Sequence, residues 1–151
     1  MKRIFDFGGF RLNEKAEAIN KLIDGLKDGN PRYPKIPVEN VYLNPNPFAY
    51  NPDWDLMKQL NPWNTLELRD KNIDNSDLPV KTIKIEDLVP TQKYLKADNL
   101  EDVTDTMDDD ILKSSISEYD GKYYILDGHH RIALRILNGE ETINSHVYIV
   151  E

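Results

Sequence analysis

The first periodic pattern of the chain lies near its beginning. Apolar residues recur there at the spacing of one helix face, at Ala16, Ile19, Leu22, Ile23 and Leu26. Asn13 precedes this stretch as a capping residue, and Gly29, Asn30 and Pro31 follow it. The pattern predicts an amphipathic helix that packs on the rest of the protein.

Proline and aromatic residues mark the next part of the chain. All nine prolines lie between residues 31 and 90, and five of them directly follow an asparagine. Asn-Pro starts turns and opposes regular helix, so extended, turning chain is expected. The aromatic residues of this stretch are Tyr42, Phe48, Tyr50, Trp54 and Trp63. Because a free linker would be less apolar, we expect an arm that lies over the C-terminal half with its aromatic rings docked.

Shorter patterns follow in the C-terminal half. The alternation of Val80, Ile83 and Ile85 predicts a strand that closes at residues 88–90, and a short helix can begin at Thr104 or Thr106. The patterns after it predict a hairpin of strands 114–119 and 122–126 around Asp120-Gly121, a helix from Gly128 to Asn138-Gly139, and a strand over 143–150. This order predicts an α+β fold, with an N-terminal helix and arm in residues 1–79 and a second domain in residues 80–151.

Charge and composition exclude several classes of function for this chain. The net charge is −8, and residues 80–151 alone carry 8 basic and 15 acidic residues, a net of −7. Such a surface repels nucleic acid and anionic membranes. The absence of cysteine excludes disulfides, thiolate metal sites and cysteine nucleophiles. Asp6 and Arg11 interrupt the apolar run of a signal peptide, so a cytoplasmic protein is expected.

The residue types best suited to ligand binding or catalysis form the segment Asp127-Gly128-His129-His130-Arg131, where a strand turns into a helix. Unpaired amides at a helix N-terminus favour an anion, and Arg131 offers a forked guanidinium for phosphate oxygens. Asp127 suits a magnesium ion or a proton from an attacking hydroxyl. The same residues also fit a plain structural role, with Asp127 as a helix cap, Gly128 as a turn residue and one histidine half-buried. Spacing alone leaves both interpretations open.

The stretch LDGHHRIAL resembles the Asp-Gly-His-His-Arg signature of the ParB/sulfiredoxin superfamily, in particular its ParB-like proteins of bacteria and bacteriophages. Upstream, IKIEDLVPTQKYL resembles the opening strand and turn of that family, so the resemblance covers about residues 80–150. It implies a small mixed-sheet core that binds nucleotide phosphates at the signature. Sulfiredoxin activity is excluded because His129 stands in place of its cysteine. The family's serine kinases place a catalytic glutamate near the first turn, where this chain has Thr91 and Gln92.

The resemblance implies binding of ATP, ADP or CTP with Mg²⁺, and a phosphotransferase or nucleotide hydrolase activity. Asp127, His129 and His130 would be catalytic, with Asp127 also the metal ligand. The nucleotide would contact Gly128, Arg131, Thr91 and Gln92. One alternative is a ParB-like nuclease or a DNA partition or modification accessory, which the negative charge disfavours.

Another alternative is a non-catalytic interaction protein that binds a protein partner through an acidic helix at 104–112 or through the arm at 31–75. Residues 97–112 contain seven acidic residues and no basic one. Asp105 and Asp109 lie four residues apart and would flank a cation on a helix, although such a run more often forms a solvated face.

Overall fold

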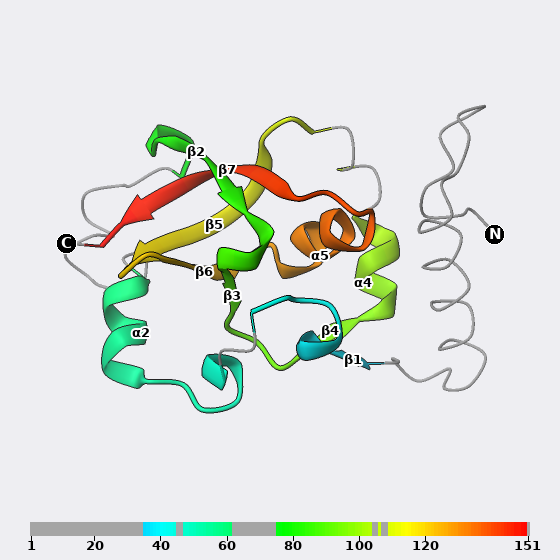
Figure 1. Ribbon diagram of the computed structural model, residues 1–151, viewed down its shortest axis with the longest axis horizontal. Coiled ribbons are helices and arrows are strands. Elements are labelled where there is room, and N and C mark those ends of the chain that lie inside the picture. Colours follow the sequence, from blue (N-terminus) through cyan, green and yellow to red (C-terminus); the bar gives the residue numbers. More distant parts are fainter. Residues whose placement is uncertain (1–34, 45–46, 62–74, 104–105, 107–108, 151) are drawn as a thin grey trace.

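The computed structural model describes residues 35–44, 47–61, 75–103, 106 and 109–150. Five strands form one mixed sheet in the order β2-β7-β5-β6-β3. These strands are β2 (Val80–Lys84), β3 (Leu88–Pro90), β5 (Leu112–Tyr119), β6 (Lys122–Asp127) and β7 (Thr142–Ile149). β7 pairs antiparallel with β2 and parallel with β5, while β6 pairs antiparallel with β5 and parallel with β3. The sheet is curled, as Figure 1 shows, and the register of β5 shifts between Ser115 and Ile116.

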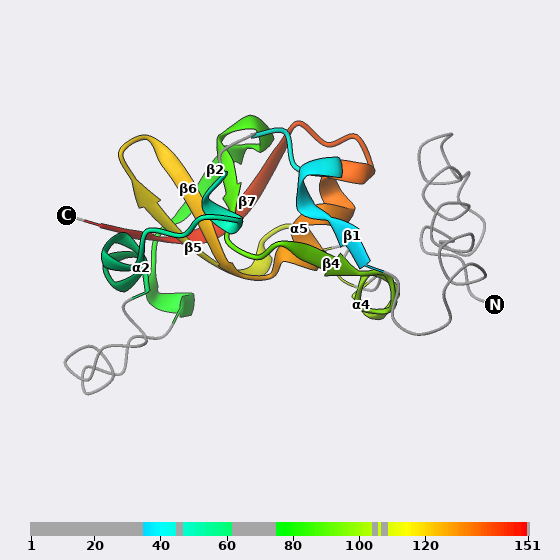
Figure 2. The same cartoon turned by 90° about the horizontal axis from the view of Figure 1, so that it is seen from below.

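Both faces of this sheet are buried at β3 and in the middle of β6, whereas alternate residues of β2 and β7 are exposed. Consecutive residues of a strand point to opposite faces, and two strand pairs show this directly. Leu88 and Ile125 belong to the cluster that includes the apolar face of α5 (His129–Leu137). Val89 and Tyr124 belong to a second cluster with α2 (Trp54–Leu60). The two helices therefore pack on opposite sides of the sheet, and they lie well apart in Figure 2.

A second, two-stranded sheet pairs β1 (Lys35–Pro37) antiparallel with β4 (Tyr94–Lys96). The remaining helices are α4 (Ala97–Asp102) and the short 3₁₀ turns η1 (Val38–Asn40), η2 (Pro47–Ala49), η4 (Asn75–Asp77) and η5 (Ile85–Asp87). The β1–β4 pairing joins the proline-rich segment to the chain that runs into α4. The described part is thus a mixed α+β structure, as expected from the order of patterns.

The proline-rich arm is partly as predicted. Tyr42 and Phe48 are docked at 4% and 6% exposure, and the Phe48 ring meets the Tyr124 ring edge-on at 5.2 Å. Tyr50 and Trp54 are exposed at 39% and 69%, so the expectation that they dock is wrong. The predicted helix near residues 13–29 and the Trp63 side chain lie outside the described residues.

The expectation that this segment contains no regular helix is also wrong. α2 begins directly after Asp53, whose carboxylate accepts hydrogen bonds from the amides of Asp55 and Leu56, both at 3.1 Å. An aspartate at this position satisfies amides that no helical carbonyl reaches. The Asn-Pro pairs at 51–52 and 61–62 bound the helix instead of preventing it.

Two predicted elements between residues 80 and 112 take another form. The strand expected from Val80 to Pro90 is divided by η5, and its last part becomes β3, paired parallel with β6. The helix expected at 104–112 does not form over Asp109–Leu112, because these residues lead directly into β5, and a helix lies earlier, as α4. Residues 104–105 and 107–108 lie outside the described ones.

Turn chemistry predicted the other boundaries well. Asp120 and Gly121 have φ of 50° and 76° and join β5 to β6 as the expected hairpin. Gly139 has φ of 86° after α5, its amide donates to the Ile136 carbonyl, and the Glu140 amide donates to the Arg135 carbonyl. This pair of bonds is the Schellman arrangement that ends helices.

Candidate functional site

The start of α5 brings the predicted site residues together. Gly128 precedes the helix with φ of 95°, a conformation that favours glycine. A Cβ atom built on Gly128 would lie 2.8 Å from Cβ of Ser114 on β5. The missing side chain therefore lets α5 approach the sheet. The space beside this glycine is therefore filled by a strand of the sheet, at Ser114 of β5.

His129 is a buried connector between α5 and the loop after β3. Its ring is 3% exposed, and its Nε2 accepts the Thr91 amide hydrogen at 2.9 Å. Its carbonyl accepts the Tyr42 hydroxyl hydrogen at 2.6 Å, and the two rings meet edge-on. Burial, followed by the charge of His130, lowers the pKa of His129 to about 3. The imidazole is therefore neutral at physiological pH.

His130 repeats this arrangement on the same loop. Its Nε2 accepts the Lys96 amide hydrogen at 3.0 Å. Burial, with the neighbouring Lys96 charge, lowers the pKa of His130 as well. The two imidazoles thus hold both ends of the segment 91–96, which contains β4. We call this pair the histidine clamp.

Thr91 and Gln92 lie at the other side of the clamp, as the sequence suggested, but their side chains donate hydrogen bonds to backbone carbonyls of this chain. The Thr91 hydroxyl donates to the Ile125 carbonyl, and the Gln92 amide donates to the Tyr94 carbonyl at 2.8 Å. These bonds fix the turn between β3 and β4. They use the side-chain donors that a ligand would need.

Asp127 and Arg131 line a shallow groove of about 540 Å³ beside β5. A carboxylate oxygen of Asp127 accepts the Gly128 amide hydrogen at 3.0 Å, and Nη1 of Arg131 donates to the Lys113 carbonyl at 2.7 Å. Nε of Arg131 is buried without a partner. Among the described residues, no three His, Asp or Glu side chains gather closely enough to hold a metal ion. The predicted roles of Asp127 and Arg131 toward Mg²⁺ and phosphate remain predictions.

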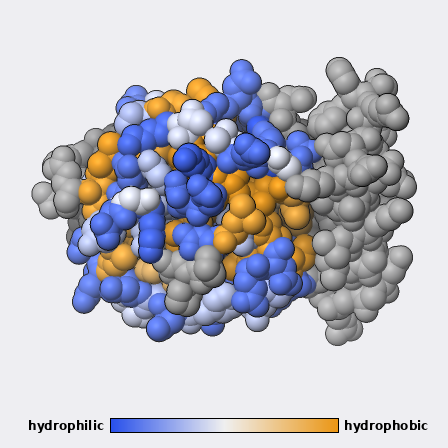
Figure 3. Space-filling model, viewed as in Figure 1, coloured by the Kyte–Doolittle hydropathy of each residue, from blue (hydrophilic) through white to orange (hydrophobic). Residues whose placement is uncertain are grey.

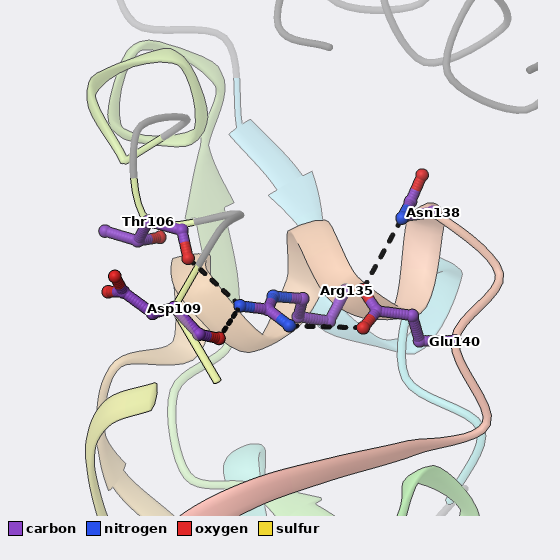
Figure 4. Close-up of polar contacts among 5 residues, drawn as sticks. All are labelled: Thr106, Asp109, Arg135, Asn138 and Glu140. Carbon is purple, nitrogen blue, oxygen red and sulfur yellow. Dashed lines mark hydrogen bonds and ion pairs between the residues drawn. The ribbon is translucent and has the colours of Figure 1, made fainter. Parts of the chain in front are cut away.

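The other end of α5 carries a feature that the sequence analysis missed. Arg135 is 8% exposed, and its guanidinium donates to the carbonyls of Thr106 and Asp109 and to the carboxylate of Glu140 (Figure 4). The Nη1 to Oε1 distance to Glu140 is 3.1 Å, and the Asn138 amide lies 3.5 Å from the other carboxylate oxygen. One buried cation therefore joins the acidic stretch before β5 to the loop after α5.

Beside this loop lies a second groove, of about 590 Å³. Leu43, Ile85 and Ile136 supply its apolar lining, and Glu86, Glu140 and Glu141 supply carboxylates; we call it the acidic groove. Figure 3 shows a hydrophobic area over η5, the end of α5 and the segment after η1, with hydrophilic residues along its border. A sequence signal existed in the consecutive Glu140 and Glu141, but nothing in the sequence indicated that Leu43 lies beside them.

No described helix is both long and apolar enough to cross a membrane. In a scan of protein families, the chain matches the family Antitoxin VapB-like over residues 54–151, which are 98 of the 151 residues. Neither the curated proteins nor the solved structures contain a match.

The family match corrects the expectation drawn from the Asp-Gly-His-His-Arg segment. Membership of the ParB/sulfiredoxin superfamily is wrong, and so is the nucleotide-dependent phosphotransferase or hydrolase function that it implied. The physical reason is visible in the clamp. His129 and His130 accept hydrogen bonds from backbone amides of this chain, so the two histidines of a segment that resembles a ligand-binding signature hold neighbouring parts of the fold together. The chain belongs to the Antitoxin VapB-like family.

Proposed function

We propose that this protein is an antitoxin that binds a partner toxin protein and neutralises it. The observation that carries the proposal is the family match over residues 54–151. This range contains the whole five-stranded sheet, α2 and α5. The non-catalytic interaction protein weighed from the sequence is therefore the alternative that best fits this chain.

The contacts at the start of α5 support a binding protein over an enzyme. The histidines are neutral and accept backbone amides, and Thr91 and Gln92 donate to backbone carbonyls. A general acid or base must exchange a proton with substrate, and a side chain committed to a structural hydrogen bond is poorly placed for that. The charge of −7 over residues 80–151 favours a partner with a basic surface.

A growth assay tests the proposal. The open reading frames on either side of this chain's gene are expressed singly from an inducible promoter, with and without the full-length chain. We expect one of them to arrest growth, the chain to restore it, and the two proteins to co-purify. If no neighbouring product arrests growth, or if the arrest persists when the chain is present in excess, the proposal is wrong.

A variant keeps this assay specific. Asp127→Asn removes a carboxylate that the enzyme interpretation required, while its remaining side-chain oxygen still accepts the Gly128 amide. We expect this variant to neutralise the toxin as well as the unchanged chain does. Loss of neutralisation by a variant that folds normally would point back to chemistry at Asp127.

A further inference from the structure

The acidic groove combines an apolar lining with charges of mainly one sign. Ile85 and Ile136 are almost fully buried and lie deep in it, whereas Leu43 is 63% exposed. Leu43 directly follows the buried pair Val41 and Tyr42, so its backbone is held in place while its side chain faces outward. An exposed leucine beside an apolar depression gains by contact with another apolar group.

The charges on this groove select among partners. Its lining contains three carboxylates, from Glu86, Glu140 and Glu141, and one ammonium group, from Lys84; with the Arg135 guanidinium that pairs with Glu140 counted as well, the formal charge is −1. The surrounding half of the chain is itself strongly negative. Phosphate groups and acidic peptides are therefore repelled here, and cationic side chains are attracted.

The groove is also preorganised at one side. Glu140 is held by the ion pair with Arg135, whose other bonds fix the carbonyls of Thr106 and Asp109. The Ile85 amide donates to the Glu141 carbonyl at 3.0 Å, which joins η5 to the loop after α5. Because η5 and the loop after α5 are joined to each other and to α5, this side of the groove is already ordered before a partner binds.

We infer that the acidic groove is the surface that receives the toxin, and that its occupant is an amphipathic segment of that protein with apolar residues against Leu43 and lysine or arginine residues against Glu86 and Glu141. This inference rests on the proposed function, and it names the surface and the chemistry by which that function is carried out. Charge complementarity over an apolar contact accounts for both the affinity and the choice of partner.

Charge reversal of the exposed rim tests the inference. The double variant Glu86→Lys/Glu141→Lys is compared with Asp77→Lys/Asp102→Lys, which changes the net charge equally at exposed positions away from the groove. Binding to the growth-arresting neighbour protein is measured by calorimetry at low and high salt. We expect the rim variant to bind at least tenfold more weakly, with a smaller salt dependence, and the control to bind within twofold of the unchanged chain.

A photo-crosslinking residue in place of Leu43 provides an independent measurement, with Val80, 45% exposed on β2, as the control position. We expect crosslinks to the toxin from position 43 only, to a peptide that contains lysine or arginine.

The outcomes separate the two claims. If the unchanged chain binds no neighbour product, the proposed function fails and the groove assignment fails with it. If the unchanged chain binds and both double variants bind equally well, or are weakened equally, only the groove assignment is overturned. Crosslinks from position 80 but not from 43 overturn it in the same way.

Discussion

The two ends of α5 use similar residue types for opposite purposes. At its start, two histidines and an arginine bind backbone atoms of neighbouring segments. At its end, one arginine takes the internal role, and carboxylates remain on the surface of a groove. The start of the helix therefore resembles a reactive site in sequence but is bonded to the backbone of its own chain, while the end has no such motif in sequence and borders the groove that we propose as the partner surface. Residue type alone does not distinguish these roles, because the role of each side chain depends on the atoms to which it is bonded.

At the start of α5, the substitution expected to lower the stability most is Gly128→Ala. A Cβ atom there would lie 2.8 Å from Cβ of Ser114, in a backbone conformation that side chains rarely adopt. Strain and overpacking together should lower the free energy of unfolding by about 3–4 kcal/mol. Gly121→Ala is the matched control, because its φ is 76° but nothing lies within 4 Å, and it should cost about 1 kcal/mol. Denaturant unfolding measures both; equal losses would show that packing on β5 is unimportant.

Arg135→Met is the next largest change. The substitution removes the donors for the carbonyls of Thr106 and Asp109 and leaves Glu140 without its ion pair. We expect a loss of about 2–3 kcal/mol in unfolding free energy. Arg131→Met, which breaks one bond to the Lys113 carbonyl, should cost about 1 kcal/mol. The reverse order of the two losses would contradict the assignment of Arg135 as the buried anchor.

The histidine clamp predicts a pH dependence of stability. The pKa of His129 is about 3 in the folded protein, below its ordinary value of 6.5, because burial disfavours the charged ring. Below pH 6.5 the unfolded chain takes up a proton that the folded chain refuses, so stability falls as the pH falls. At about 1.4 kcal/mol per pH unit, the loss from His129 between pH 6.5 and pH 5 is about 2 kcal/mol.

The variant His129→Gln isolates this contribution, because a glutamine oxygen can accept the Thr91 amide hydrogen without titrating. Urea unfolding at pH 7 and pH 5 should show a smaller difference between the two pH values in the variant than in the unchanged protein. An identical pH dependence would exclude His129 as its source.

The smallest effect on stability is expected at the other end of the helix. Glu86 and Glu141 are exposed, so Glu86→Lys/Glu141→Lys should change the unfolding free energy by less than about 0.5 kcal/mol. Thermal unfolding checks this directly. Together with a tenfold loss of toxin binding, this result would show that the rim serves recognition; a large loss of stability would instead give it an architectural role.

Sequence patterns predicted the parts of the fold that local chemistry decides. Asp120-Gly121 and Asn138-Gly139 marked the hairpin and the end of α5, because the positive φ values of Asp120, Gly121 and Gly139 favour these residue types. The helix expected at 104–112 does not form over the described residues 109–112, since Leu112 belongs to β5 and pairs with Ser145 of β7, so long-range pairing overrode the local pattern. β3 was also missed as a separate strand, because its partner is β6, more than thirty residues later.

The site was harder to predict for the same reason. The histidines accept hydrogen bonds from the amides of Thr91 and Lys96, and these sequence separations of 38 and 34 residues leave no trace in any local pattern. Leu43 and Glu141 line the same groove only because β1 and η1 pack near the end of α5. A short motif shows which groups are close in the sequence, but the fold determines whether their polar atoms already have hydrogen-bond partners within the protein.

The place of β7 has a consequence for synthesis on the ribosome. β7 follows the other four strands of the sheet in the chain, yet it lies inside the sheet, where it is the only strand of the described residues that pairs with β2. Until residues 142–149 emerge, β2 has no strand to pair with, and one long side of β5 stays open to other chains. The sheet can therefore be completed only after β7 has been synthesised and has paired with β2 on one side and β5 on the other.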